Sequence, residues 1–363
     1  MRLSDIATFV EEKVSSEDIS LSQYVTTDSL LQNKAGRTVA QNLPPQKCSL
    51  NSFKKGDVLL GNIRPYLKKI WYATIDGGCS QNVLVLRAKE NKDSSFLYAL
   101  LSQDSFFEYE MKATKGSKMP CGDKNHIMNF PCIYLKNKIG IGSFLSSIDK
   151  KIALNRRINA RLEQMAKRLY DYWFVQFDFP NSDGKPYKSS GRKMVYNAEL
   201  KREIPEGWEV KSFSDFFELG NGKDYRHLQS GKIPVYGSGG FMCGITDFLF
   251  DGESVLFPRK GTLNNIMYKN EKFWTVDTMF YSKMKIQHSA IYVYYTAKQF
   301  DFSSLNTGTG VPSMTSVIIK GLPIIQPPQK IIDNFDCIVQ SYYKKIHKNE
   351  QESAKLTALR DEL

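Results

Sequence analysis

The residues that could catalyse a reaction on DNA do not occur in the spacings that such enzymes need. An adenine methyltransferase holds its target amino group with Asn or Asp followed by Pro-Pro and an aromatic residue, yet here the two Pro-Pro pairs follow Leu43 and Gln326. The glycine-rich run 237–240 lacks the G-x-G-x-x-G spacing, and Gly-Lys at 222–223 is followed by Asp224 where a phosphate loop needs Ser or Thr. We therefore expect no catalytic residue in this chain.

Three potential metal ligands, Cys121, His126 and Cys132, lie close together in the sequence. Their spacing matches no Cys-x-x-Cys pattern of the kind that binds zinc. The six cysteines are scattered through a long chain, which is typical of reduced thiols in a cytoplasmic protein. We expect no metal ion and no disulfide framework.

Basic, aromatic and amide side chains gather in short segments of both halves of the chain, and these types can bind DNA. Arginine and lysine donate to guanine O6 and N7, asparagine pairs with adenine N6 and N7, and further lysines can neutralise phosphates. In the first half we expect contacts from Arg64, Tyr66, Lys68, Lys69, Lys115, Lys118 and Lys124. In the second half we expect them from Lys223, Tyr225, Arg226, His227, Arg259, Lys260, Asn264 and Asn265.

The elements that position these residues occur twice. Residues 148–155 align with 342–349 and share Lys-Lys-Ile-x-x-Asn. Upstream, the matched residues are Gly116, Pro120, Ile127, Pro131 and Ile133 with Gly308, Pro312, Ile319, Pro323 and Ile325. Farther back, Arg64 and 67–72 correspond to Arg259 and 263–268, and 3–6 to 213–216. Such self-similarity predicts two copies of one module, each followed by a helix.

Two long amphipathic helices are predicted at 139–176 and 329–363. Their apolar residues recur three and four positions apart, a spacing typical of a coiled-coil seam. Asn155 and Asn349 are polar members of the seam that could fix its register. Alternatively, each helix packs only on its own domain.

The remaining segments, 1–138 and 177–328, have the pattern of mixed domains. Short apolar or β-branched runs, typical of strands, occur at 58–60, 69–73, 82–86, 254–257 and 265–268. A polar loop at 181–192 precedes the second domain. The fold class we predict is α+β.

The charge and hydropathy of the chain favour a polyanionic partner. The 363 residues carry a formal net charge of +12. No apolar run approaches the roughly 18 to 20 residues of a membrane span, and acidic residues near the start make a secretion signal unexpected. We expect a cytoplasmic protein that does not bind membranes.

These features together resemble the specificity subunits of type I restriction-modification systems, over nearly the whole chain. The resemblance rests on an ordered series of segments: Gly56–Leu59, Ile63–Pro65, Ile148–Asn155, Leu169–Phe177, Ile204–Trp208, Pro234–Gly240, Pro323 and Pro327–Lys330. The chain departs from the family pattern at Glu352 and Ser353, which stand where the first helix has Ile158 and Asn159.

The resemblance implies two target-recognition domains, 1–138 and 177–328, that each read one half of a split, asymmetric DNA sequence. Two long antiparallel helices, 139–176 and 329–363, would form a coiled-coil pair between them and give an internal pseudo-two-fold repeat. It also implies two modification subunits that use S-adenosylmethionine to methylate adenine, and restriction subunits that use ATP and magnesium. No cofactor is expected in this chain.

Two alternatives stay open from the sequence. The chain could serve a related system in which one partner chain both methylates and cleaves. It could instead be a structural coiled-coil adaptor with two protein-binding modules, although an adaptor does not need basic and aromatic loops in both copies. The aromatic residues Trp173, Phe174 and Phe177 suggest a surface that partners cover.

Overall fold

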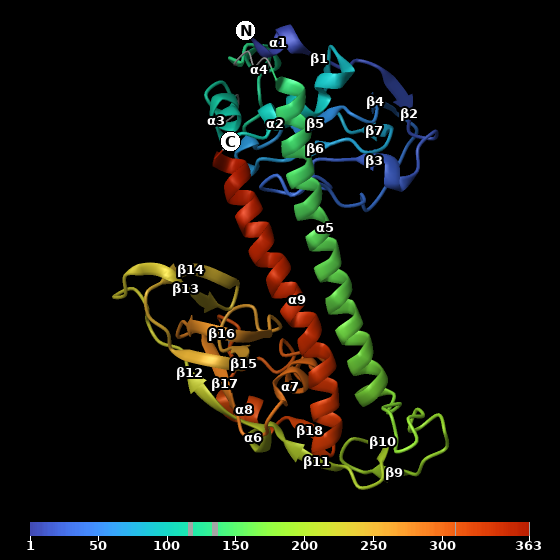
Figure 1. The fold of residues 1–363 in the computed structure, drawn as a ribbon, viewed down its shortest axis with the longest axis vertical. Coiled ribbons are helices and arrows are strands. Elements are labelled where there is room, and N and C mark those ends of the chain that lie inside the picture. The colour runs from blue at the N-terminus through green and yellow to red at the C-terminus, as the bar shows by residue number, and fades with distance from the viewer. Residues whose placement is uncertain (115–118, 133–136, 309, 363) are drawn as a thin grey trace. The chain divides into compact units, whose positions relative to one another are not determined.

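The computed structural model describes residues 1–114, 119–132, 137–308 and 310–362. The chain forms two compact units, one made of Met1–Arg156 with Glu350–Leu363 and the other of Arg157–Asn349 (Figure 1). Both units combine sheets with helices, so the predicted α+β class is confirmed. The four-part division at 138, 176 and 328 is a division by sequence and stays a prediction.

The first unit contains two four-stranded sheets. One has the strand order β1-β8-β5-β6, formed by Ala7–Phe9, Val83–Ala88, Val58–Gly61 and Ile70–Tyr72. The other has the order β2-β4-β7-β3, formed by Lys13–Ser15, Ser49–Phe53, Gly77–Cys79 and Tyr24–Val25. The helices are α1 (Leu3–Ile6), α2 (Ser94–Leu101), α3 (Asp104–Met111) and α4 (Lys124–Met128).

The continuous apolar run 58–60 forms strand β5 because the side chains on both faces of this strand are buried. Successive side chains of a strand point to opposite faces. Val58 and Leu60 pack into the core that contains α2, whereas Leu59 packs into a second core with Phe53 and Trp71. Both faces of β5 are therefore buried, and β5 lies in the interior of its sheet.

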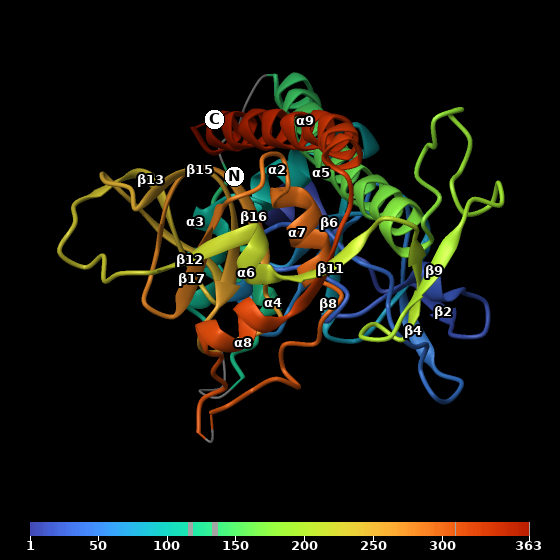
Figure 2. The same ribbon diagram turned by 90° about the horizontal axis from the view of Figure 1, so that it is seen from below.

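The second unit contains a six-stranded sheet of order β12-β17-β15-β16-β13-β14. Its strands are Phe217–Asn221, Met279–Met284, Phe250–Pro258, Met267–Thr275, Ser230–Gly237 and Gly240–Ile245. Two pairs accompany it: β9 (Met194–Asn197) with β10 (Arg202–Pro205), and β11 (Glu209–Ser212) with β18 (Pro323–Gln326). Figure 2 shows these elements with the short helices α6 (Phe213–Phe216), α7 (Ala290–Ala297) and α8 (Ser316–Gly321).

The internal repeat predicted from the sequence is visible in matching hydrogen bonds of the two units. Helix α1 begins where the N–H of Leu3 donates to the Phe130 carbonyl, and α6 begins where the N–H of Phe213 donates to the Leu322 carbonyl, both at 2.9 Å. In each short helix an aspartate accepts from the N–H of the N-cap residue: Asp5 from Arg2 at 2.7 Å in α1, and Asp215 from Ser212 at 2.8 Å in α6. The two units thus share local geometry as well as sequence.

The two long helices are α5 (Lys138–Tyr170), which ends in a π-helical turn at Asp171–Val175, and α9 (Gln329–Glu362). They run antiparallel within each unit. In the first unit Asp149 pairs with Arg360 (3.1 Å), and Asn155 Nδ2 donates to Glu352 Oε2 (2.8 Å) and Ser353 Oγ. Glu352 and Ser353, the polar residues of α9 that depart from the family pattern, therefore have a polar partner on α5, the amide of Asn155.

In the second unit the same helices meet through an amide pair and an aromatic core. Asn349 Nδ2 donates to Asn159 Oδ1 at 2.7 Å, and the rings of Tyr170 and Phe335 are 6.3 Å apart. Trp173, Phe174 and Phe177 are buried with Phe335 in this core. The prediction that these three aromatic residues form a partner-covered surface was wrong, because Trp173 and Phe174 of the π-helical turn and Phe177 just after it all pack into this core.

No helix in the described parts of the chain is both long and apolar enough to cross a membrane.

Candidate nucleic-acid interface

Three loops of the second unit are tied together by hydrogen bonds at one end of its sheet. The N–H of Lys223 donates to the Thr275 carbonyl at 2.9 Å, and the indole N–H of Trp274 donates back to the Lys223 carbonyl at 2.8 Å. The N–H of Arg259 donates to the Thr278 carbonyl at 2.7 Å. These bonds bring the predicted segments 223–227 and 259–265 to the same pair of strand ends.

A cleft of about 460 Å³ opens between these loops and the β13–β14 turn. It contains Tyr225 and Arg226 from the predicted set, together with residues that the sequence analysis did not select. The complete lining is Asp224, Tyr225, Arg226, Gly237, Ser238, Gly239, Gly240, Phe241, Met242, Val276, Asp277 and Thr278. A hydrophobic pair directly after a glycine-rich turn is the sequence signal that could have indicated Phe241 and Met242.

The predicted cations of this unit are exposed. The side chain of Arg226 is 85% exposed and lies 4.0 Å from Asp224. Lys223, His227, Arg259 and Lys260 are exposed as well. The Arg259 guanidinium lies 5.7 Å from the centre of the Phe280 ring, so this ring supports its inner side.

The two predicted asparagines donate hydrogen bonds to other loops of the same unit. Asn264 Nδ2 donates to Asp301 Oδ1 (2.8 Å) and to Ser303 Oγ (3.0 Å). Asn265 Nδ2 donates to the Ser238 carbonyl at 2.8 Å and so holds the β13–β14 turn. Reading adenine through either amide would require these hydrogen bonds to break.

In the first unit a tight turn presents Arg64. Arg64 (φ 52°) and Lys68 (φ 50°) are both left-handed and flank the short 3₁₀ helix Pro65–Leu67. The N–H of Arg64 donates to the Pro120 carbonyl at 2.8 Å. Arg64 and Tyr66 are exposed, so the turn presents one guanidinium and one phenol to solvent.

The predicted lysines of the first unit make different contacts. Lys68 pairs with Asp104 at 3.0 Å, and Lys69 Nζ donates to the Thr27 carbonyl. Lys124 begins α4, and its ammonium group lies 5.5 Å from the centre of the Phe9 ring. Lys115 and Lys118 lie outside the described residues.

The turn that carries Arg64 adjoins a buried carboxyl group on α3. Glu110 is fully buried, and neither of its oxygens has a hydrogen-bond partner among the described residues. A Cβ atom added to Gly122 would lie 2.4 Å from Glu110 Oε1 and 2.8 Å from Asn62 Oδ1. Burial raises the pKa of Glu110 to about 8, so this group is protonated at neutral pH. No pattern in the sequence indicated this buried carboxyl group.

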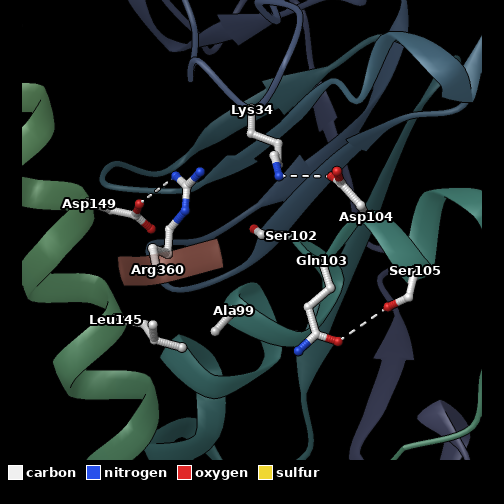
Figure 3. A pocket seen from close by; sticks show the side chains of 9 residues that line it. All are labelled: Lys34, Ala99, Ser102, Gln103, Asp104, Ser105, Leu145, Asp149 and Arg360. Carbon is white, nitrogen blue, oxygen red and sulfur yellow. Dashed lines mark hydrogen bonds and ion pairs between the residues drawn. The ribbon is translucent and has the colours of Figure 1, made fainter. Parts of the chain in front are cut away.

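Another hollow of the first unit, about 330 Å³, is lined by charges that are already paired (Figure 3). Lys34 Nζ lies 3.0 Å from Asp104 Oδ1, and Arg360 pairs with Asp149. Lys34 and Lys68 together lower the pKa of Asp104. The Arg360–Asp149 pair joins the end of α9 to α5 in the first unit. The lining contains two cations and two carboxylates, so it offers no excess of positive charge to an anion.

The possible metal ligands noted in the sequence make other contacts. His126 stacks on Tyr109 with ring centres 4.1 Å apart, and the Cys132 thiol is buried beside the Phe130 carbonyl. Across the described ranges no group of three or more His, Cys, Asp or Glu residues could hold a metal ion.

Comparison with known proteins shows what this chain is similar to. The family model of the type I restriction modification DNA specificity domain matches residues 205–358. Over most of its length the chain is similar to the type I restriction enzyme MjaIX specificity subunit of Methanocaldococcus jannaschii, with 26% identity over 351 residues that cover 88% of this chain and 78% of that protein.

A second specificity subunit is similar over most of its length as well. The HindI specificity subunit of Haemophilus influenzae is 22% identical over 425 residues, covering 93% of this chain and 91% of that protein. The crystal structure of the type I S subunit from M. genitalium superimposes with a TM-score of 0.66 at 14% identity, covering 99% of this chain and 93% of that one. The specificity-subunit fold therefore extends over both units.

Proposed function

We propose that this specificity subunit reads a bipartite, asymmetric sequence in double-stranded DNA, one half with each repeated unit. The observation that carries the proposal is the repeated arginine loop. In both units an exposed arginine, Arg64 or Arg259, stands on a loop hydrogen-bonded to a second loop through a proline carbonyl, that of Pro120 or Pro312. In each unit the guanidinium group is exposed while the backbone of its loop is held by hydrogen bonds. Such a group suits bidentate contact with guanine.

The contacts would divide between bases and phosphates. Arg64 and Tyr66 in the first unit, and Arg226 and Arg259 in the second, are exposed and suit base contact. The other exposed cations of the loops would neutralise phosphates, so that affinity falls steeply with salt concentration. The predicted set remains, in full, Arg64, Tyr66, Lys68, Lys69, Lys115, Lys118, Lys124, Lys223, Tyr225, Arg226, His227, Arg259, Lys260, Asn264 and Asn265.

The subunit would catalyse no reaction itself and would position partner subunits on DNA. Two modification subunits would carry S-adenosylmethionine and methylate adenine, and restriction subunits would carry ATP and magnesium. The similarity to type I specificity subunits supports this division of labour. The seam of α5 and α9 supplies a rigid support in each unit, through Asn155 in the first and Asn159 in the second.

The experiment that tests this function is methylation-detecting long-read sequencing of cells that carry a modification subunit with and without this chain. We expect a split adenine-methylated motif only when this chain is present. Absence of such a motif in cells where the two proteins are made and co-purify would contradict the proposal and favour the coiled-coil adaptor.

A further inference from the structure

Phe241 and Met242 form an exposed apolar tip on the second unit, and their exposure has no explanation within the unit. Phe241 is 67% exposed and Met242 is 50% exposed. They are the second and third residues of strand β14 (Gly240–Ile245) and follow the turn in which Gly237 pairs with Gly240. Figure 1 labels the β13–β14 hairpin that contains them. Exposed apolar side chains beside polar loops often mark a binding surface.

The tip is held in a fixed position. Phe241 lies opposite Tyr236, with the rings 6.4 Å apart in an edge-to-face arrangement. Met242 packs closely on the other strand, since a Cβ atom added to Gly237 would lie 2.7 Å from its Sδ. Asn265 holds the Ser238 carbonyl of the turn, as described above. A rigid tip can contact a ligand without losing much conformational entropy.

The turn beside the tip is unusually thin. Gly240 has a φ of +111°, which favours glycine, and a Cβ atom added to Gly239 would meet nothing within 4 Å. The backbone of the hairpin can therefore approach a partner closely with only Ser238 contributing a side chain. This shape suits insertion into a groove.

The charges around the tip identify the occupant as DNA. Arg226 lines the same cleft as Phe241, and Arg259 and Lys260 are bonded through their backbone to Thr278, which also lines it. Two carboxylates, Asp224 and Asp277, lie inside the cleft. Phosphates would therefore favour the flanking cations, whereas the cleft and its apolar tip would face base edges, where a carboxylate can accept from cytosine N4.

We propose that Phe241 and Met242 are base-contacting, specificity-determining residues of the second unit. Their side chains enter a groove of duplex DNA and make apolar contacts with base edges, such as the thymine methyl group, while Arg226, Arg259 and Lys260 hold the flanking phosphates and bases. This inference rests on the proposed function and adds residues that no charge-based selection would include.

The test selects duplexes from a random-sequence pool with the full chain co-expressed with its modification subunit. The wild type is compared with Phe241→Ser, Met242→Ser and the apolar variant Phe241→Leu. Phe248→Ser is the matched control, because Phe248 is an exposed phenylalanine of the same unit that does not line the cleft.

We expect the two serine variants to lose base preference at one or two positions of one half-site. Their affinity for the duplex selected by the wild type should fall about tenfold or more. The slope of affinity against salt should stay unchanged, because no phosphate contact is lost. Phe241→Leu and Phe248→Ser should select the wild-type motif.

The inference is overturned if both serine variants select the wild-type motif with wild-type affinity. It is also overturned if they weaken binding equally on all sequences, since the tip would then lack base contacts. A wild type that selects no motif would instead refute the proposed function, and the inference with it. Circular dichroism of each variant confirms that it is folded.

Discussion

At the scale of single residues, Arg259 combines a fixed backbone with an exposed side chain. Its backbone N–H donates to the Thr278 carbonyl, and its own carbonyl accepts from the N–H of Met314 at 2.8 Å. The backbone is thus fixed on both sides while the guanidinium remains exposed. Little conformational freedom of the backbone remains to be lost on binding.

We expect Arg259→Ala to lose discrimination at one position of one half-site, at a cost of about 1–3 kcal/mol. Binding competition between the selected duplex and single-position variants measures this. The matched variant Arg64→Ala should affect the other half-site. Uniform weakening on every sequence, with a shallower salt dependence, would assign Arg259 to a phosphate instead.

Glu110 gives a prediction about pH. Its pKa is about 8 in the folded state and 4.5 ordinarily, so between these values the folded chain retains a proton that the unfolded chain releases. The stability it contributes is fully present below pH 4.5 and is lost as pH rises through about 8. Glu110→Gln should remove this dependence, worth on the order of a few kcal/mol.

Denaturant unfolding of the wild type and Glu110→Gln from pH 5 to pH 8.5 measures this difference. The wild type should weaken toward pH 8.5 more than the variant does. Parallel pH profiles would show that Glu110 does not titrate differently in the folded chain. Comparison with the variant removes the contribution of Asp336, whose pKa burial raises to about 6.

The sequence predicted the residue types of the candidate interface better than the contacts that these residues make. Composition and repetition pointed to Arg64 and Arg259, and the structure exposes both. It could not show that Lys68 pairs with Asp104, or that the Asn265 amide holds Ser238, because these partners are distant in the sequence. Charge also gave no reason to select an apolar tip.

At the scale of elements, the α5–α9 seam contains a polar pair whose value can be measured. Asn349 is 2% exposed, and its amide donates to Asn159 Oδ1. Asn349→Leu would leave the Asn159 carbonyl oxygen without this donor and should cost about 1–3 kcal/mol of stability. Replacing both residues by leucine should recover most of the loss, because the Asn159 carbonyl oxygen that lost its donor is then removed as well.

Thermal unfolding followed by circular dichroism compares the single variant, the double variant and the wild type. A double variant that is as unstable as Asn349→Leu would contradict this account, since the loss would then come from packing and not from an unsatisfied amide. The recovered double variant is expected to lose register specificity, because a buried amide pair is what distinguishes one alignment of the seam from others.

Helices were more predictable than sheets in this chain. A periodic apolar pattern is local, and the helices at 138–170 and 329–362 follow it closely. The runs at 58–60 and 254–257 also form strands as predicted, within β5 and β15. The β13–β14 hairpin was not predicted, because its glycines lower strand propensity and its position depends on pairing between β13 and β16.

At the scale of the whole molecule, the internal repeat was the most informative property of the sequence. It predicted two related units from a handful of aligned residues, and the matching hydrogen bonds of α1 and α6 confirm it. The repeat could not predict that the two loop sets differ in chemistry. The first displays an arginine and a tyrosine on a 3₁₀ turn, whereas the second surrounds a cleft with an apolar tip.

The first unit is built from two separate segments of the chain, and this has a consequence for biosynthesis. Residues 350–362 belong to it together with residues 1–156, and they are joined to it by contacts such as Arg360 with Asp149. A ribosome must therefore add the 157–349 segment before the first unit can receive its last helical turns. Until then the seam of α5 around Asn155 has no partner from α9, and a nascent chain at this stage would be an attractive substrate for chaperones.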